Sequence, residues 1–184
     1  MDHPKMKFRT TERGIRFNPN LYSEGKVCLS IIGTWSGPGW TSCMTLTTLL
    51  NSVQTLLNEN PINNEPGYER YTKNNSKSQE YNLYINYQNV RFAFIEMMNK
   101  PPYGFDEFKP IMEKYFIKNY PFFIQKLEDF SKGCYENQEY TSGIYSIHYK
   151  FRINELKKKL QNLIEQHDLV GKIPEHKKEN LENQ

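Results

Sequence analysis

The chain has 184 residues, of which 37% are hydrophobic and 24% charged, with a formal net charge of +3. This length suits one domain, or one domain with an extension, and excludes two full-sized domains. Thirteen tyrosines and eleven phenylalanines exclude a chain that is disordered throughout. A net charge this small gives no indication of nucleic-acid binding.

No apolar run approaches about 18 residues, so we expect no membrane span. The charged first residues, MDHPKMKFRTTER, do not resemble a signal peptide. These features predict a soluble, intracellular protein that is cytoplasmic, with the nucleus as a second candidate compartment. The three cysteines and four histidines are scattered without C-x-x-C spacing, so we expect free thiols, no disulfide framework and no metal site.

The first half of the chain mixes extended and helical patterns. Residues 5–10 alternate polar and apolar side chains, which predicts a half-buried strand. Glycines and a proline indicate a loop over residues 33–40. Apolar residues then recur at helical spacing from Leu46 to Leu57, which predicts a helix over 45–57 that ends before Pro61.

The second half reads as predominantly helical. Residues 70–79 are polar enough to predict a mobile loop. Three later stretches carry helical spacing: 80–99, 105–130 with a bend at Pro121, and 144–164. We expect the end of the chain, from Lys172, to be frayed.

The stretch FNPNLYSEGKVCL over residues 17–29 resembles the active-site block of the ubiquitin-conjugating (UBC) enzymes. In that family the pattern is His-Pro-Asn, followed after a short loop by Gly-x-Ile/Val-Cys-Leu. The matching positions here are Pro19, Asn20, Gly25, Val27, Cys28 and Leu29. Asn18 stands where the family usually has histidine, whose role there is structural hydrogen bonding.

The resemblance continues beyond this block. Trp40 and the helix ending SVQTLL are similar to the tryptophan and helix that follow the active site in the family, and Asn60-Pro61 matches its Asn-Pro turn. Within the family, the stretch from Asn18 through GKVCLSI to the GTW and GP loop is most similar to the Z-type conjugating enzymes. The similarity runs from His3 to about Val170.

The resemblance implies an α+β, UBC-like fold that lacks the family's N-terminal helix and first strands and carries a C-terminal helical extension. We therefore predict an N-terminally incomplete UBC core at 1–130, a helical extension at 131–171 and a flexible tail at 172–184. A lone strand at 5–10 would have unpaired edges. We expect the chain, expressed alone, to be marginally stable or prone to aggregate.

The resemblance also implies a reaction. Ubiquitin or a ubiquitin-like modifier would pass from an activating enzyme to Cys28 as a thioester, and then to a substrate lysine, usually with a ligase. The chemistry asks for an exposed thiol that can ionise, and Asn20 would support the oxyanion. Partners would be the modifier, an activating enzyme specialised for the Z-type, a ligase and protein substrates. We expect no nucleic acid, no membrane and no cofactor, since ATP is used upstream by the activating enzyme.

Two other functions fit parts of the sequence. Cys28 could serve a cysteine hydrolase with His148 and an asparagine, although no local signature supports that function. The chain could also be a catalytically inactive UBC-like binding module. Retention of Cys28 and Asn20 disfavours the inactive module, and the short N-terminal region favours it. Formation of a reductant-sensitive ubiquitin adduct would separate the conjugating enzyme from both.

Overall fold

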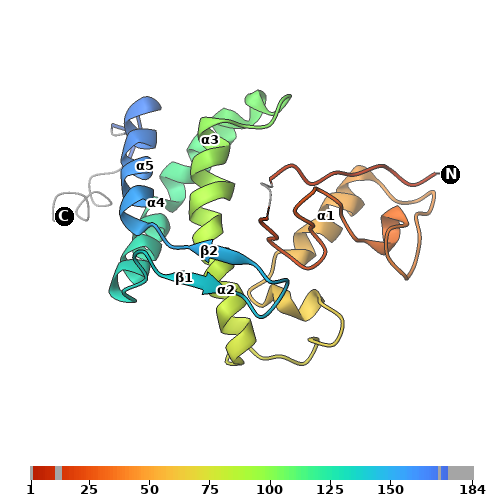
Figure 1. Cartoon of the computed structure of the whole chain (residues 1–184). Coiled ribbons are helices and arrows are strands. Elements are labelled where there is room, and N and C mark those ends of the chain that lie inside the picture. Colours follow the sequence, from red (N-terminus) through yellow and green to blue (C-terminus); the bar gives the residue numbers. More distant parts are fainter. Residues whose placement is uncertain (1, 11–13, 170, 174–184) are drawn as a thin grey trace. The chain divides into compact units, whose positions relative to one another are not determined.

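A computed structural model describes residues 2–10, 14–169 and 171–173. The chain forms two compact units, the first made of Met1–Gln88 with Ser142–Tyr145, the second of Asn89–Thr141 with Ser146–Gln184 (Figure 1). The described residues combine helices with one two-stranded antiparallel sheet, which fits the predicted α+β class. The predicted boundaries at residues 130 and 171, and the incomplete N-terminal region, stay predictions.

The first unit holds the predicted helix, which is confirmed as α1, Leu46–Leu56. Thr45 caps it by accepting a hydrogen bond from the Thr48 backbone N–H at 3.3 Å, and the Thr48 hydroxyl accepts from the Thr45 N–H at 3.2 Å. This reciprocal capping box explains how a helix begins in a threonine-rich stretch. The 3₁₀ turns η1, Ser30–Ile32, and η2, Pro61–Asn64, precede and follow α1.

Only part of the predicted apolar stripe of α1 is buried. Leu49 and Leu56 are 3% and 8% exposed and pack in a cluster with Leu21, Val27 and Ile32. The leucines on the other side of α1 are 54 to 67% exposed: Leu46, Leu50 and Leu57. The helix therefore presents apolar side chains both to the core and to the surface of the described structure.

The strand predicted at residues 5–10 is wrong, since these residues carry no regular secondary structure. They instead run close to Gly25, whose carbonyl accepts a hydrogen bond from the Phe8 N–H at 2.9 Å. A Cβ at Gly25 would lie 2.8 Å from the Lys7 side chain, and its φ is +95°. Glycine is therefore required at this position for both close approach and conformation.

Helix α2, Ser76–Gln88, begins inside the stretch predicted as a mobile loop. The chain then continues through a π-helical segment, Asn89–Glu96, into the short helix α3, Met97–Asn99. The helix predicted at 80–99 is therefore helical throughout, but it starts earlier and contains a π-helical stretch. π-Helical stretches are rare and frequently occur at functional sites.

In the second unit, a 3₁₀ turn at Asp106–Phe108 leads into α4, Lys109–Lys132, with Pro121 inside it. Strands β1, Glu139–Thr141, and β2, His148–Lys150, pair antiparallel with Tyr140 opposite Tyr149. The last helix, α5, is Ile153–Gln166.

The prediction of a helix from residue 144 is thus wrong for its first nine residues. The chain turns sharply there, with φ of +63° at Tyr145 and +49° at Ser146, values that a right-handed helix excludes.

The core of the second unit is built from aromatic rings and the apolar face of α5. The Phe94 ring stacks on Phe116 and Phe123 at centroid distances of 5.0 and 4.1 Å. The buried residues of α5 follow helical spacing: Ile153, Leu156, Leu160, Leu163 and Ile164. Here the predicted amphipathic pattern is confirmed.

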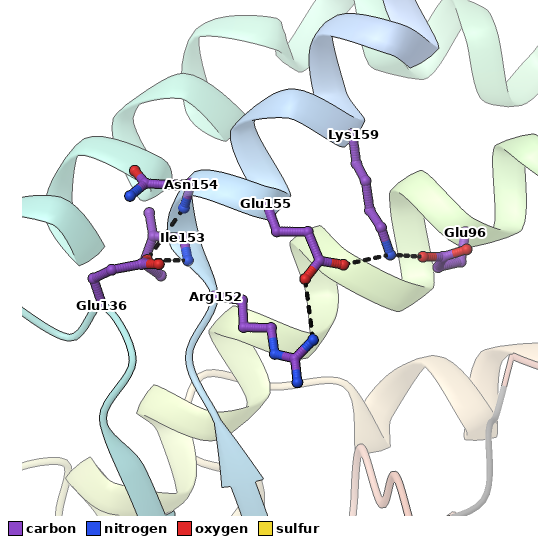
Figure 2. Close-up of polar contacts among 7 residues, drawn as sticks. All are labelled: Glu96, Glu136, Arg152, Ile153, Asn154, Glu155 and Lys159. Atoms are coloured by element: carbon purple, nitrogen blue, oxygen red, sulfur yellow. Dashed lines mark hydrogen bonds and ion pairs between the residues drawn. The ribbon is translucent and has the colours of Figure 1, made fainter.

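Polar groups fix the start of α5 and one side of it (Figure 2). The Glu136 carboxylate accepts hydrogen bonds from the backbone N–H groups of Ile153 and Asn154, at 2.5 and 3.2 Å. It therefore caps a helix that has no cap from its own preceding residue. Lys159 donates to Glu96 at 2.8 Å and pairs with Glu155 at 3.3 Å, so it ties α5 to the π-helical segment. Lys159 and Arg152 lower the pKa of Glu155 through hydrogen bonds.

Candidate active site

The candidate site lies on the loop between residues 14 and 34 in the first unit. Isolated bridges join Leu21 to Asn18 and to Val27. A turn at 22–25 reverses the chain, with the Gly25 N–H donating to the Tyr22 carbonyl and the Tyr22 N–H donating to the Lys26 carbonyl, both at 2.9 Å. This reversal brings the two predicted site residues next to each other.

Asn20 and Cys28 form a pair through two hydrogen bonds. The Cys28 N–H donates to the Asn20 carbonyl at 2.8 Å, and the Asn20 Nδ2 donates to the Cys28 carbonyl at 2.8 Å. The Oδ1 of Asn20 is buried and has no hydrogen-bond partner among the described residues. The two residues therefore lie side by side, as groups that act on one transferred carbonyl must.

The thiol is not exposed as the chemistry led us to expect. Cys28 is 2% exposed, whereas Cys43 and Cys134 are exposed. Cys28 lies outside any helix. Hydrogen bonds fix the residues on both sides of Cys28, because the Thr34 hydroxyl donates to the Val27 carbonyl at 2.7 Å and accepts from the Leu29 N–H at 3.0 Å. These bonds fold residues 27–34 back on themselves next to Cys28.

Asn18 stabilises the pair through two hydrogen bonds. It is fully buried, its Nδ2 donates to the Leu56 carbonyl at 2.7 Å, and its Oδ1 accepts from the Asn20 N–H at 2.8 Å. One side chain therefore joins the last turn of α1 to the residue that faces Cys28. At this position asparagine makes the structural hydrogen bonds expected of the family's histidine.

A further group of residues at the site has no signal in the sequence. The Arg16 guanidinium donates to the Pro19 carbonyl at 2.6 Å and lies between the rings of Tyr22 and Tyr145, 4.0 and 3.9 Å from their centroids. Tyr145 also donates a short hydrogen bond to Glu65. Burial and this bond raise the pKa of Tyr145. The spacing of apolar residues predicted a helix at Tyr145, and no pattern in the sequence indicated its contact with Arg16.

His148, the base of the alternative hydrolase, lies on β2, where its Nδ1 is 2.9 Å from the Thr141 hydroxyl. Among the described residues, no cluster of three or more histidine, cysteine, aspartate or glutamate side chains could hold a metal ion. The helices that the structure describes include none with the length and apolar character needed to cross a membrane.

Comparison with known proteins agrees with the resemblance. Residues 1–89 match the family model described as ubiquitin-conjugating enzyme. Residues 1–89 belong to the ubiquitin-conjugating enzyme family. The chain is 36% identical over 164 residues to ubiquitin-conjugating enzyme E2 Z of Xenopus tropicalis, covering 81% of this chain and 52% of that protein.

The proteins of the same name from Homo sapiens and Danio rerio are each 40% identical, over 127 and 121 residues. Those alignments cover 68% and 65% of this chain, and 36% and 37% of the relatives. The similarity to Z-type conjugating enzymes is thus confirmed. The chain spans about half the length of the Xenopus relative and about a third of the other two.

Proposed function

We propose that this chain is a ubiquitin-conjugating enzyme that carries ubiquitin, or a ubiquitin-like modifier, as a thioester on Cys28 and transfers it to a substrate lysine. The observation that carries the proposal is the hydrogen-bonded pair of Asn20 and Cys28 within the family's active-site block. Membership of the family supports the reaction class.

In the first step the Cys28 thiolate attacks the thioester carbonyl at the end of the modifier. A new S–C bond forms, the cysteine thiolate of the activating enzyme leaves, and one thioester replaces another at nearly equal energy. No cofactor takes part in this exchange, because ATP is used upstream by the activating enzyme.

In the second step the amine of a substrate lysine attacks the new thioester. The N–C bond forms, the S–C bond breaks with its electron pair leaving on Cys28 as a thiolate, and the amine proton passes to solvent water. Asn20 has two N–H hydrogens on Nδ2, and the Cys28 carbonyl takes one of them. The second is the donor that would stabilise the oxyanion while the Oδ1 stays buried.

The 2% exposure of Cys28 favours one competing function, the inactive UBC-like binding module. Both functions predict binding to ubiquitin-pathway partners, but only the conjugating enzyme forms a thioester. We further propose that, like the Z-type, the chain works with a specialised activating enzyme, a ligase and protein substrates.

The decisive experiment incubates the full chain with ubiquitin, activating enzyme and ATP. We expect a reductant-sensitive adduct that Cys28→Ser converts into a reductant-resistant ester, whereas Cys43→Ser and Cys134→Ser leave it unchanged. Asn20→Ala should charge normally but lose about 10²- to 10³-fold in discharge to lysine. A panel of activating enzymes and modifiers would identify the partner pair. Absence of any adduct across the panel would support the inactive module.

A further inference from the structure

The tip of the hairpin between β1 and β2 belongs to the same compact unit as the candidate site. Residues Ser142–Tyr145 group with residues 1–88, whereas the strands on either side group with the second unit. The tip is anchored at two carboxylates. The Gly143 N–H donates to Glu80 Oε1 at 2.8 Å, and the Tyr145 hydroxyl donates to Glu65. A segment far along the chain therefore forms part of the catalytic unit.

The ring of Tyr145 makes a cation–π contact with Arg16. The guanidinium carbon lies over this ring and over that of Tyr22, 3.9 and 4.0 Å from the centroids. The Arg16 carbonyl also accepts a hydrogen bond from the Tyr81 hydroxyl at 2.9 Å. A planar cation in contact with two rings loses rotational freedom, so its N–H groups keep a restricted direction.

That direction points to the peptide group between Pro19 and Asn20. Arg16 holds the oxygen of this peptide at 2.6 Å, and Asn18 holds its N–H at 2.8 Å. Because a peptide group is planar, fixing both polar atoms fixes the plane. The Asn20 side chain leaves the backbone directly after this plane, so its direction toward Cys28 depends on both bonds.

We propose that Tyr145 and Arg16 are positioning residues for the transfer reaction, and that the hairpin tip acts through them to aim Asn20 at Cys28. The inference rests on the proposed function of Cys28 and adds a specific role for the C-terminal half of the chain. Neither residue is assigned contact with the modifier.

The test compares substitutions that keep or remove the ring over Arg16. Tyr145→Phe keeps the ring and removes the bond to Glu65, whereas Tyr145→Leu removes the ring. Arg16→Lys keeps the charge but loses the planar, forked donor. Tyr140→Leu is the matched control, since Tyr140 lies on β1 of the same hairpin and its ring stacks on Tyr149 instead.

Discharge of the charged enzyme to free lysine is the first readout. A misplacement of about 1 Å can cost about 10²-fold in rate, so we expect Tyr145→Leu and Arg16→Lys to lower kcat about 10- to 100-fold. In the charging step, which is measured separately, the KM for the charged activating enzyme should stay the same. Tyr145→Phe and Tyr140→Leu should stay within about twofold of the unmodified chain. Equal kcat in all four variants would overturn the inference.

Hydrogen exchange of the Asn20 backbone and side-chain N–H groups, followed by NMR, is a readout that needs no transfer. We expect Tyr145→Leu to speed both at least about tenfold, by analogy with the local opening of other loops, while amides of α1 are unchanged and Tyr145→Phe has no effect. Unchanged Asn20 exchange in Tyr145→Leu would overturn the inference even if discharge fell. If the unmodified chain forms no thioester, the proposed function fails. The exchange data alone then decide whether Tyr145 and Arg16 hold Asn20 in place.

Discussion

Replacing Asn18 by alanine should loosen the candidate site and destabilise the first unit. The substitution removes the acceptor of the Asn20 N–H and one donor to the Leu56 carbonyl. The Leu56 carbonyl keeps another donor, the Asn58 N–H at 3.1 Å, so the main cost is the orphaned Asn20 N–H. Leaving a fully buried group without its partner costs about 1–3 kcal/mol. Because the Asn20 N–H is partly buried, we expect a loss of about 1–2 kcal/mol.

Tryptophan fluorescence during urea unfolding isolates this effect. Both tryptophans, Trp35 and Trp40, lie in the first unit, so the signal reports on that unit alone. With a slope of about 1–3 kcal/mol per M, a loss of about 2 kcal/mol lowers the midpoint by about 1 M. The control is Asn82→Ala, which removes one exposed bond to the Glu59 carbonyl and should change stability by less than about 0.5 kcal/mol.

A second substitution at the same position tests the direction of the bonds. Asn18→Asp keeps an acceptor for the Asn20 N–H but places a buried carboxylate against the Leu56 carbonyl. We expect a larger loss than for alanine at pH 7, and partial recovery in acid, where the protonated carboxyl can donate to that carbonyl. If Asn18→Ala matched the control, or Asn18→Asp were insensitive to pH, the assigned bonding of Asn18 would be refuted.

Four further substitutions test the packing of α1, the cap of α5 and the pH dependence of stability. Leu49→Ala should cost about 2–5 kcal/mol and its exposed neighbour Leu50→Ala less than about 0.5 kcal/mol; equal losses in urea unfolding would contradict the observed face of α1. Glu136→Ala should cost about 0.5–2 kcal/mol of cap energy and speed amide exchange at Ile153; unchanged exchange would rule out the cap. Burial raises the pKa of the Tyr120 hydroxyl to about 12. The contribution of neutral Tyr120 to the free energy of unfolding is therefore complete below about pH 10, the pKa of an unfolded tyrosine, and is lost as the pH rises through about 12. Tyr120→Phe should therefore lessen alkaline unfolding followed by circular dichroism, and an unchanged pH profile would contradict this.

Local signals in the sequence were enough for α1 and for the apolar face of α5, whereas the choice of Cys28 and Asn20 as site residues came from the resemblance to a family and stays a prediction. The spacing of apolar residues located α1 to within a residue at each end. Which leucines face the core was not predictable, because apolar residues occupy positions on both sides of the helix. Leu49 and Leu50 are equally apolar, and only their neighbours in the folded unit distinguish them.

The hairpin was missed for a physical reason. Ile144, Ile147 and Phe151 follow the spacing of an amphipathic helix and are all buried, as a helix would also require. The turn depends on left-handed backbone at Tyr145 and Ser146, residues that rarely adopt it and give no warning in the sequence. The contact of Tyr145 with Arg16 joins distant parts of the chain and was equally invisible.

Exposure alone selects Cys43 or Cys134 and not Cys28, since Cys43 and Cys134 are the exposed thiols and Cys28 is covered. A covered free cysteine is usually an inert core residue. Cys28 differs because both of its backbone polar atoms are bound to Asn20 and its sulfur is not part of either bond. Uncovering Sγ therefore does not require either of these two bonds to break. The bonds hold Asn20 beside the Cys28 backbone but do not bind the thiol, so the proposed reaction needs a movement that exposes Sγ and can leave the pair intact.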